Sequence, residues 1–266
     1  MLWDTHMHCH FSGDSETPPR DMIESAIKKG LSGICFTDHL DLDYREEPGY
    51  FDLDFEHYQA EIMALKEEYA DCLSILWGIE LGLQPHVASQ NLEAIHAFPW
   101  DFVIGSSHVV DHIDIYYPNF YEGRTERTAY RRYFESILEN LATDVDFDVY
   151  GHLDYVVRYG PNKNQSFSYE KYSDLIDEIL RKLIEKGKGI EMNMAGFKYG
   201  LGHPNPTEDI LKRYHELGGE IITIGSDGHK PEQIAWDYHK VPELLKGAGF
   251  EYYTVFKNRT PEFIKL

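Results

Sequence analysis

Seven short apolar runs recur along this chain of 266 residues, and polar or ionisable side chains follow each of them. The runs cover residues 2–5, 33–37, 73–79, 102–104, 147–150, 189–190 and 221–224. Helical patterns lie between them, in 55–69, 125–141, 169–186 and 207–217. Because strands that alternate with helices pair in parallel, this pattern predicts an α/β fold built on a parallel sheet.

The polar residues that follow the runs favour a closed barrel over an open sheet. In a TIM-like barrel the C-terminal ends of all strands converge on one point, whereas an open doubly wound sheet offers two or three ends at its switch point. Nearly every run here ends in a candidate ligand. The sequence has no long linker and no shift in composition, so we expect a single domain over residues 1–266.

Charge and cysteine content exclude several classes of protein. With 25 basic and 46 acidic residues the net charge is −21, which nucleic acid and anionic membranes would repel. The three cysteines are widely spaced and form no disulfide framework. The polar N-terminus is not a signal peptide, and no stretch approaches the roughly 18 apolar residues of a membrane span. We expect a soluble cytoplasmic protein without a nucleic-acid or membrane partner, and nothing indicates its oligomeric state.

The placement of histidine indicates a metal site. Six of the 14 histidines fall just after apolar runs, and three carboxylates occupy similar positions. Alternate residues of a strand point the same way, so the two histidines of His6-x-His8 can bind one ion together. The nine candidate ligands are His6, His8, Asp14, His39, Glu80, His108, His152, Asp227 and His229.

Nine ligands are too many for a single tetrahedral zinc ion, which takes four. Two or three divalent ions that share a bridging carboxylate fit better. Mixed imidazole and carboxylate ligands suit zinc, manganese or iron, and the sequence does not choose among them. Such a cluster lowers the pKa of a bridging water and binds the oxygens of an in-line displacement. The sequence therefore predicts a hydrolase of phosphate esters or amides.

The motifs HMH, TDH, GIE, SSH, GHLD and GSDGH occur in this order. Together they resemble the PHP (polymerase and histidinol phosphatase) superfamily, with matching motifs from Asp4 to His229. The segments HLDYVVRYG, EMNMAG and HPNP, with SGDS in place of a histidine-containing loop, are similar to the histidinol-phosphatase branch. The resemblance implies a distorted (β/α)7 barrel with a trinuclear metal site, and hydrolysis of L-histidinol phosphate in histidine biosynthesis.

The resemblance also implies how the ligands divide among three ions. His6, His8, Glu80 and Asp227 would hold the first ion. Glu80 would bridge it to a second ion on His108 and His152, and Asp14, His39 and His229 would hold the third. Asp14 departs from the family pattern, because many relatives have histidine there. Family members use a hydroxide that bridges two metals as the nucleophile, in agreement with the water activation argued from the ligands.

A small phosphorylated metabolite also needs positive groups around its phosphate. Arg158 lies six residues after His152 and can bind phosphate bidentately, so we expect it to act in catalysis and substrate binding. His203 and Asn193 are further candidates for substrate contact. The leaving alcohol would take its proton from an acidic residue or a metal-bound water, with Asp227 as the candidate residue.

Other functions remain compatible with these ligands. An amidohydrolase-type barrel also begins with HxH, but it commonly bridges its metals with a carboxylated lysine, and this chain offers Glu80 at the equivalent strand end. A phosphotyrosine phosphatase or a phosphodiesterase of the same superfamily would use the same metals. A non-enzymatic metal-binding protein would not need Arg158.

The remaining polar and aromatic residues are interpreted as structural. Asp38 is expected to support the fold rather than bind metal, and the acidic run of Asp41, Asp43, Glu46 and Glu47 is interpreted as a solvated loop. The other histidines, His86 and His112 among them, are interpreted as ordinary surface or hydrogen-bonded residues. The 19 tyrosines and 14 phenylalanines predict core packing rather than a binding cage.

Overall fold

A parallel sheet that curls into a barrel forms the centre of the protein. The computed structural model describes residues 2–266. Within that range the strand order is β1 (Trp3–Asp4), β2 (Gly33–Phe36), β4 (Ser74–Gly82), β5 (Phe102–Ser106), β8 (Val149–Tyr150), β9 (Gly189–Asn193) and β10 (Ile222–Gly225). Each predicted run forms one of these strands. A parallel bridge between Met7 and Gly228, beyond the ends of β1 and β10, brings the two edge strands together. The predicted distorted TIM-like barrel is therefore confirmed.

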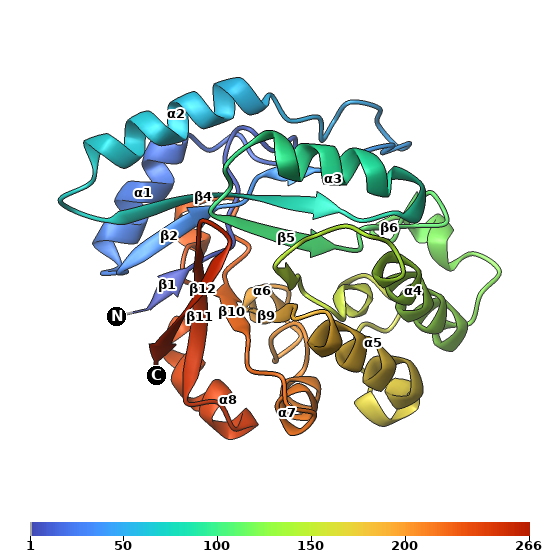
Figure 1. Ribbon diagram of the computed structural model, residues 1–266. Helices are drawn as coiled ribbons and strands as arrows, with labels where there is room; N and C mark the ends of the chain where they lie inside the picture. Colours follow the sequence, from blue (N-terminus) through green and yellow to red (C-terminus); the bar gives the residue numbers. More distant parts are fainter. Residues whose placement is uncertain (1) are drawn as a thin grey trace.

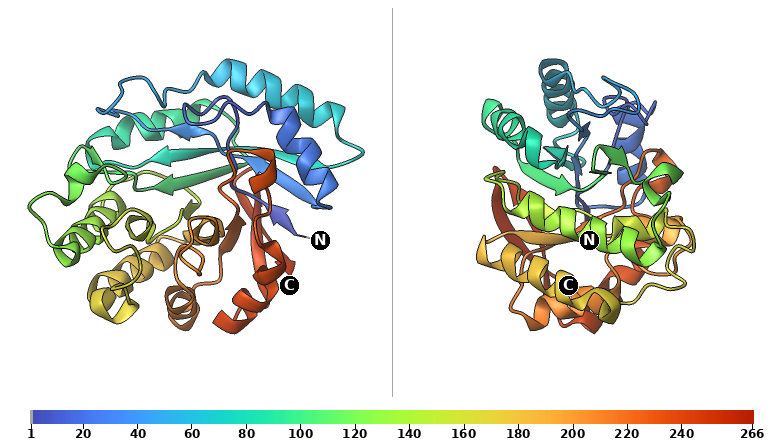
Figure 2. Two further views of the ribbon diagram at one scale, coloured as in Figure 1. Left: turned by 180° about the vertical axis from the view of Figure 1, so that it is seen from behind. Right: turned by 90° about the vertical axis from the view of Figure 1, so that its right-hand side faces the viewer.

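Helices surround the sheet on its outside (Figures 1 and 2). They are α1 (Pro19–Lys28), α2 (Phe55–Glu68), α3 (Ala88–Ala97), α4 (Glu126–Leu141), α5 (Ser173–Glu185), α7 (Glu208–Glu216) and α8 (Val241–Ala248). The short helix α6 (Ala195–Lys198) instead follows the end of β9, beside the site. Asp54 and Thr125 cap α2 and α4, because each side chain accepts a hydrogen bond from a backbone N–H of the first turn. The four predicted helical segments are all found.

Short elements complete the chain. β3 (His39–Leu40) pairs with β4, and two hairpins are formed by β6 (Val109–Val110) with β7 (Ile113–Asp114) and by β11 (Tyr252–Lys257) with β12 (Thr260–Lys265). The 3-10 turns are η1 (Pro85–Val87), η2 (Pro118–Tyr121), η3 (Tyr155–Arg158), η4 (Tyr169–Tyr172), η5 (Pro231–Gln233) and η6 (Tyr238–Lys240). Within the described part of the chain, no helix combines the length and apolar character needed to cross a membrane.

Close packing at the strand ends sets the geometry of the site. Gly225 ends β10 where His6 and Glu191 approach it from the neighbouring segments. A Cβ atom at Gly225 would lie 2.2 Å from Glu191 Oε1 and 2.3 Å from His6 Cβ. Glycine is therefore required here for β1, β9 and β10 to bring their polar side chains together.

Candidate metal centre

The nine predicted ligands converge at the C-terminal ends of the strands. Each places an imidazole nitrogen or carboxylate oxygen within 3.6 Å of another member of the set. They come from strand ends and from the loops that follow them around the barrel, as the convergence argument requires. Asp227 has a φ of +52°, a left-handed conformation that non-glycine residues adopt mainly at constrained functional positions.

Glu80 is the centre of the cluster. Its Oε2 lies 3.1 Å from His39 Nδ1, 3.2 Å from His6 Nε2 and 3.6 Å from His8 Nε2. Its Oε1 lies 3.0 Å from His152 Nε2 and accepts a 2.6 Å hydrogen bond from a serine hydroxyl. The carboxylate is completely buried, so both of its oxygens are shared among imidazoles rather than solvated.

Buried carboxylates orient two of the imidazoles. His6 Nδ1 donates to Glu191 Oε1 at 2.6 Å, and His108 Nδ1 donates to Asp41 Oδ1 at 2.8 Å. Each ring therefore keeps its Nε2 lone pair free on the side of Glu80, the arrangement that outer carboxylates impose on metal-binding histidines. Asp41 is only 3% exposed. Its interpretation as part of a solvated loop was wrong, because the neighbouring strand β4 buries it against His108.

Asp38 supports the fold, as predicted. It accepts hydrogen bonds from the backbone and thiol of Cys9 and from Ser12 Oγ. Ser12 Oγ in turn lies 3.2 Å from His8 Nδ1. Asp38 thus holds the ring of His8 in place through Ser12.

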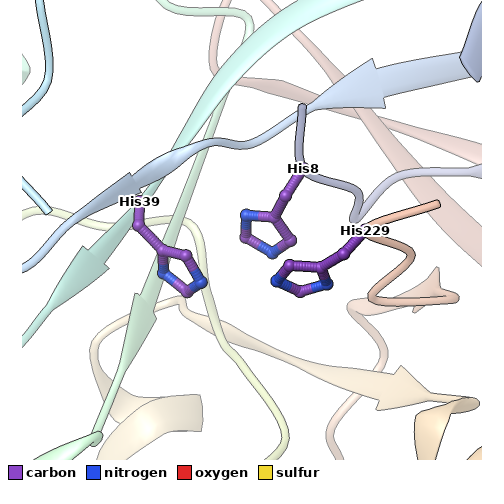
Figure 3. A group of neighbouring side chains, drawn as sticks. All are labelled: His8, His39 and His229. Atoms are coloured by element: carbon purple, nitrogen blue, oxygen red, sulfur yellow. The ribbon is translucent and has the colours of Figure 1, made fainter. Parts of the chain in front are cut away.

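Three histidines from separate segments, His8, His39 and His229, point toward one another (Figure 3). The ring of His8 lies close to both others, with centroid distances of 4.1 Å to His39 and 4.3 Å to His229. Asp14 Oδ2 lies 3.0 Å from His229 Nε2 and 3.8 Å from His39 Nε2. His8 is therefore shared between this group and the deeper one around Glu80.

The charges of the cluster stabilise one another. Burial raises the pKa of the Glu80 carboxyl, but His6 and His39 outweigh burial and hold this pKa well below its usual range. Burial lowers the pKa of His39, whereas Glu80 and Asp14 raise it, with a net result of about 9. Burial also raises the pKa of Asp41, which the neighbouring histidines lower to about 2. The carboxylates of Glu80 and Asp41 therefore remain ionised and attract positively charged groups to the cluster.

The donor set fits divalent metal ions. Three groups within this cluster bring their ligand atoms within 4.8 Å of one another: His6, His8 and Glu80; Glu80, His108 and His152; and His8, His39 and His229. Within residues 2–266, His152 Nδ1 is buried and has no hydrogen-bond partner. A buried imidazole nitrogen without a partner is costly, and nitrogen and oxygen donors of this kind suit zinc, manganese or iron.

Arg158 lies beside the cluster and is almost fully buried. Its Nη1 donates to Asp227 Oδ2 at 2.8 Å, its Nε to Asn205 Oδ1 at 2.9 Å and its Nη2 to Asn193 Oδ1 at 2.9 Å. Burial raises the pKa of Asp227, but Arg158 outweighs burial and holds it well below its usual value. An ionised Asp227 can serve as a metal ligand, and its second role as a proton donor stays a prediction.

Asn193 and His203, the two further residues predicted to contact substrate, lie in different surroundings. Asn193 is completely buried, and its amide donates to Glu191 Oε2 while its Oδ1 accepts from Arg158. It therefore positions the guanidinium. His203 lies on the loop after α6, where its Nδ1 donates to the carbonyl of Pro204. His203 is not among the described residues that line the cavities beside the cluster.

Two adjoining cavities open onto the cluster. The first, of about 250 Å³, is lined by cluster residues together with Arg158 and Lys198. Lys198 Nζ donates to the carbonyl of Asp227 at 2.7 Å and gives this cavity a second cation. Lys198 was not among the residues predicted from the sequence, although it follows the EMNMAG segment at the end of β9.

The second cavity, of about 320 Å³, is mainly aromatic and carries one buried carboxylate, Asp114. Three of these rings, Tyr116, Tyr117 and Tyr199, are exposed rather than packed in the core as predicted. The rings of the cavity are Tyr44, Tyr50, Phe51, Tyr116, Tyr117, Tyr155, Tyr159 and Tyr199.

Comparisons with known proteins agree with the motifs. The PHP domain model matches residues 4–195. The histidinol-phosphatase of Lactococcus lactis subsp. lactis is 36% identical over 258 residues, which cover 95% of this chain and 93% of that protein. A crystal structure of histidinol phosphate phosphatase from the same organism, complexed with zinc, L-histidinol and phosphate, superposes with a TM-score of 0.91 at 35% identity and covers 98% of both chains. A structure from Listeria monocytogenes, at 19% identity, has a TM-score of 0.78 over 90% of this chain and 99% of that one, and so supports the fold alone.

Proposed function

The chain belongs to the PHP domain family, and from this membership we propose that it is a histidinol-phosphatase, which hydrolyses L-histidinol phosphate to L-histidinol and phosphate. The observation that carries the proposal is the likeness, over almost the whole chain, to a relative crystallised with both products of that reaction. The cluster of imidazoles and carboxylates beside two cations supplies matching chemistry on this chain's own residues.

Two or three divalent ions would be held by the nine clustered residues. Glu80 would be shared between ions on His6 and His8 and on His108 and His152. His39 and His229 would hold a further ion with Asp14 and the shared His8. When bound, such ions polarise phosphoryl oxygens and make water a stronger nucleophile at neutral pH.

The positive groups of the first cavity would bind the phosphate. A guanidinium has five N–H donors, and Arg158 gives three of them to named protein groups. The remaining donors, together with the ammonium of Lys198, would bind phosphate oxygens at the cavity wall. The carbonyl of Asp227 and the amide of Asn193 hold these two cations in place.

The aromatic cavity would take the leaving group. L-Histidinol carries an amine and an imidazole, and tyrosine rings with one buried carboxylate suit a flat, partly cationic group of that size. Asp114 already accepts hydrogen bonds from Tyr44 and from a backbone N–H, which fix its carboxylate at the cavity wall. A nucleic acid, by contrast, would be repelled by the net charge of −21 that this chain carries.

A substrate comparison tests the proposal. We expect kcat/KM for histidinol phosphate to exceed that for an aryl phosphate, a phosphotyrosyl peptide and a phosphodiester by several decades. Steady-state assays with the four substrates on one metal-loaded preparation measure this ratio. Equal values for all four would indicate a general phosphoesterase, and a preference for the peptide would assign the chain to protein dephosphorylation.

Metal content gives a second test. We expect more than one divalent ion per chain by elemental analysis, because one ion cannot use ligands on all sides of Glu80. Removal with a chelator should abolish activity while circular dichroism stays unchanged, and activity should return on addition of zinc, manganese or iron. A single ion per chain with full activity would contradict the clustered assignment.

A further inference from the structure

A second group of metal-ligating side chains lies outside the cluster, formed by Asp43, His86 and His112. Asp43 belongs to the loop between β3 and α2, His86 to η1, and His112 to the turn between β6 and β7. His86 Nε2 lies 2.8 Å and His112 Nδ1 3.5 Å from the same atom, Asp43 Oδ2. The imidazole centroids are 4.7 Å apart. Three segments far apart in sequence thus bring two nitrogens and one oxygen to one point.

These spacings suit a tetrahedral ion. Metal–ligand bonds of about 2.0–2.1 Å place neighbouring ligand atoms of tetrahedral zinc about 3.3 Å apart, between the two distances on Asp43. The side chains of His86 and His112 are each 41% exposed, so water can reach the site as a fourth ligand. Both rings also border a cavity of about 190 Å³.

Arg45 already places a positive charge on the same oxygen of Asp43. Its Nε and Nη2 both donate to Asp43 Oδ2, at 3.1 and 3.0 Å. The guanidinium is 53% exposed, and among the described residues its ionic partner is Asp43 of its own loop, so it can leave at small cost. A divalent ion on the two imidazoles would replace its charge beside Asp43.

We propose that Asp43, His86 and His112 form a separate binding site for one transition-metal ion of the zinc class. The ion links η1 to two segments that already contact each other, since Tyr44 donates to Asp114 Oδ2 and Asp114 N donates to Glu46 Oε1. Tyr44 and Asp114 line the aromatic cavity. The ion would thus tie η1 to the two segments that carry Tyr44 and Asp114, whatever substrate the cavity takes.

Metal counting on matched variants tests the site. Holoenzyme dialysed against micromolar zinc should bind one ion per chain more than the double variant His86→Gln/His112→Gln. The control His57→Gln/His96→Gln removes two histidines outside the group and should keep the wild-type count. Equal counts in wild type and His86→Gln/His112→Gln would overturn the proposal. If that variant does not fold, Asp43→Asn serves the same comparison.

A competition experiment identifies the ligand oxygen. Because Arg45 and the ion compete for Asp43 Oδ2, Arg45→Gln should bind this additional zinc more tightly than wild type. Titration against a chromophoric chelator measures the affinity. An unchanged or weaker affinity in Arg45→Gln would contradict coordination by Asp43.

Discussion

Glu80→Gln is expected to lower kcat/KM for histidinol phosphate by about a thousandfold or more. Glu80 is the carboxylate shared by two of the ligand groups, the one with His6 and His8 and the one with His108 and His152. An amide keeps the shape but removes the charge that would bridge two ions, and metal activation is worth several kcal/mol, where about 1.4 kcal/mol corresponds to tenfold in rate. The variant should also contain fewer ions per chain. Steady-state kinetics and elemental analysis of the same preparation measure both effects.

Glu191→Gln is the matched control for this prediction. Glu191 is equally buried and also contacts His6, but it does so at Nδ1, on the far side of the ring from Glu80. Outer partners of metal ligands typically contribute about 10–100-fold in affinity or activity. Glu191→Gln should therefore lose less activity than Glu80→Gln. If both variants lose the same activity and the same number of ions, Glu80 is not a bridging ligand.

The strands and their terminal ligands could be predicted because both are local features of the sequence. A short apolar run such as 102–104 predicts its own strand, and barrel closure alone then determines where the following His108 lies. The contact of Asp14 with His229, which is 215 positions later in the chain, was instead an expectation from the family resemblance. No knowledge of helix packing was needed for these residues.

Partners that depend on the approach of separate segments could not be predicted. Asp41 lies in an acidic run that is typical of a solvated loop, and only the pairing of β3 with β4 buries it beside His108. Lys198 has no sequence pattern of its own, because its role depends on the turn that carries the Asp227 carbonyl. The tyrosines of the aromatic cavity likewise could not be told from core residues in the sequence. They line a cavity only because loops far apart in the chain come together.

Arg158→Ala should separate substrate binding from structural support. The guanidinium is the ion-pair partner of Asp227 Oδ2 and donates to two buried amide oxygens, so its removal takes away the strongest positive charge beside Asp227 in the metal-free protein. Breaking one side of a buried pair typically costs about 3–5 kcal/mol of unfolding free energy. Bound ions would neutralise Asp227, so the destabilisation should be smaller in the metal-loaded protein. Urea unfolding with and without metal measures this difference.

The kinetic effect of the same substitution distinguishes a phosphate ligand from a purely structural arginine. If Arg158 binds the phosphate, Arg158→Ala should raise KM for histidinol phosphate more than it lowers kcat, and it should weaken inhibition by inorganic phosphate in parallel. Arg158→Lys keeps the charge beside Asp227 but lacks the planar fork that contacts Asn193 and Asn205. It should therefore recover part of the stability and little of the phosphate affinity. An unchanged KM with a full loss of stability would restrict Arg158 to holding Asp227 in place.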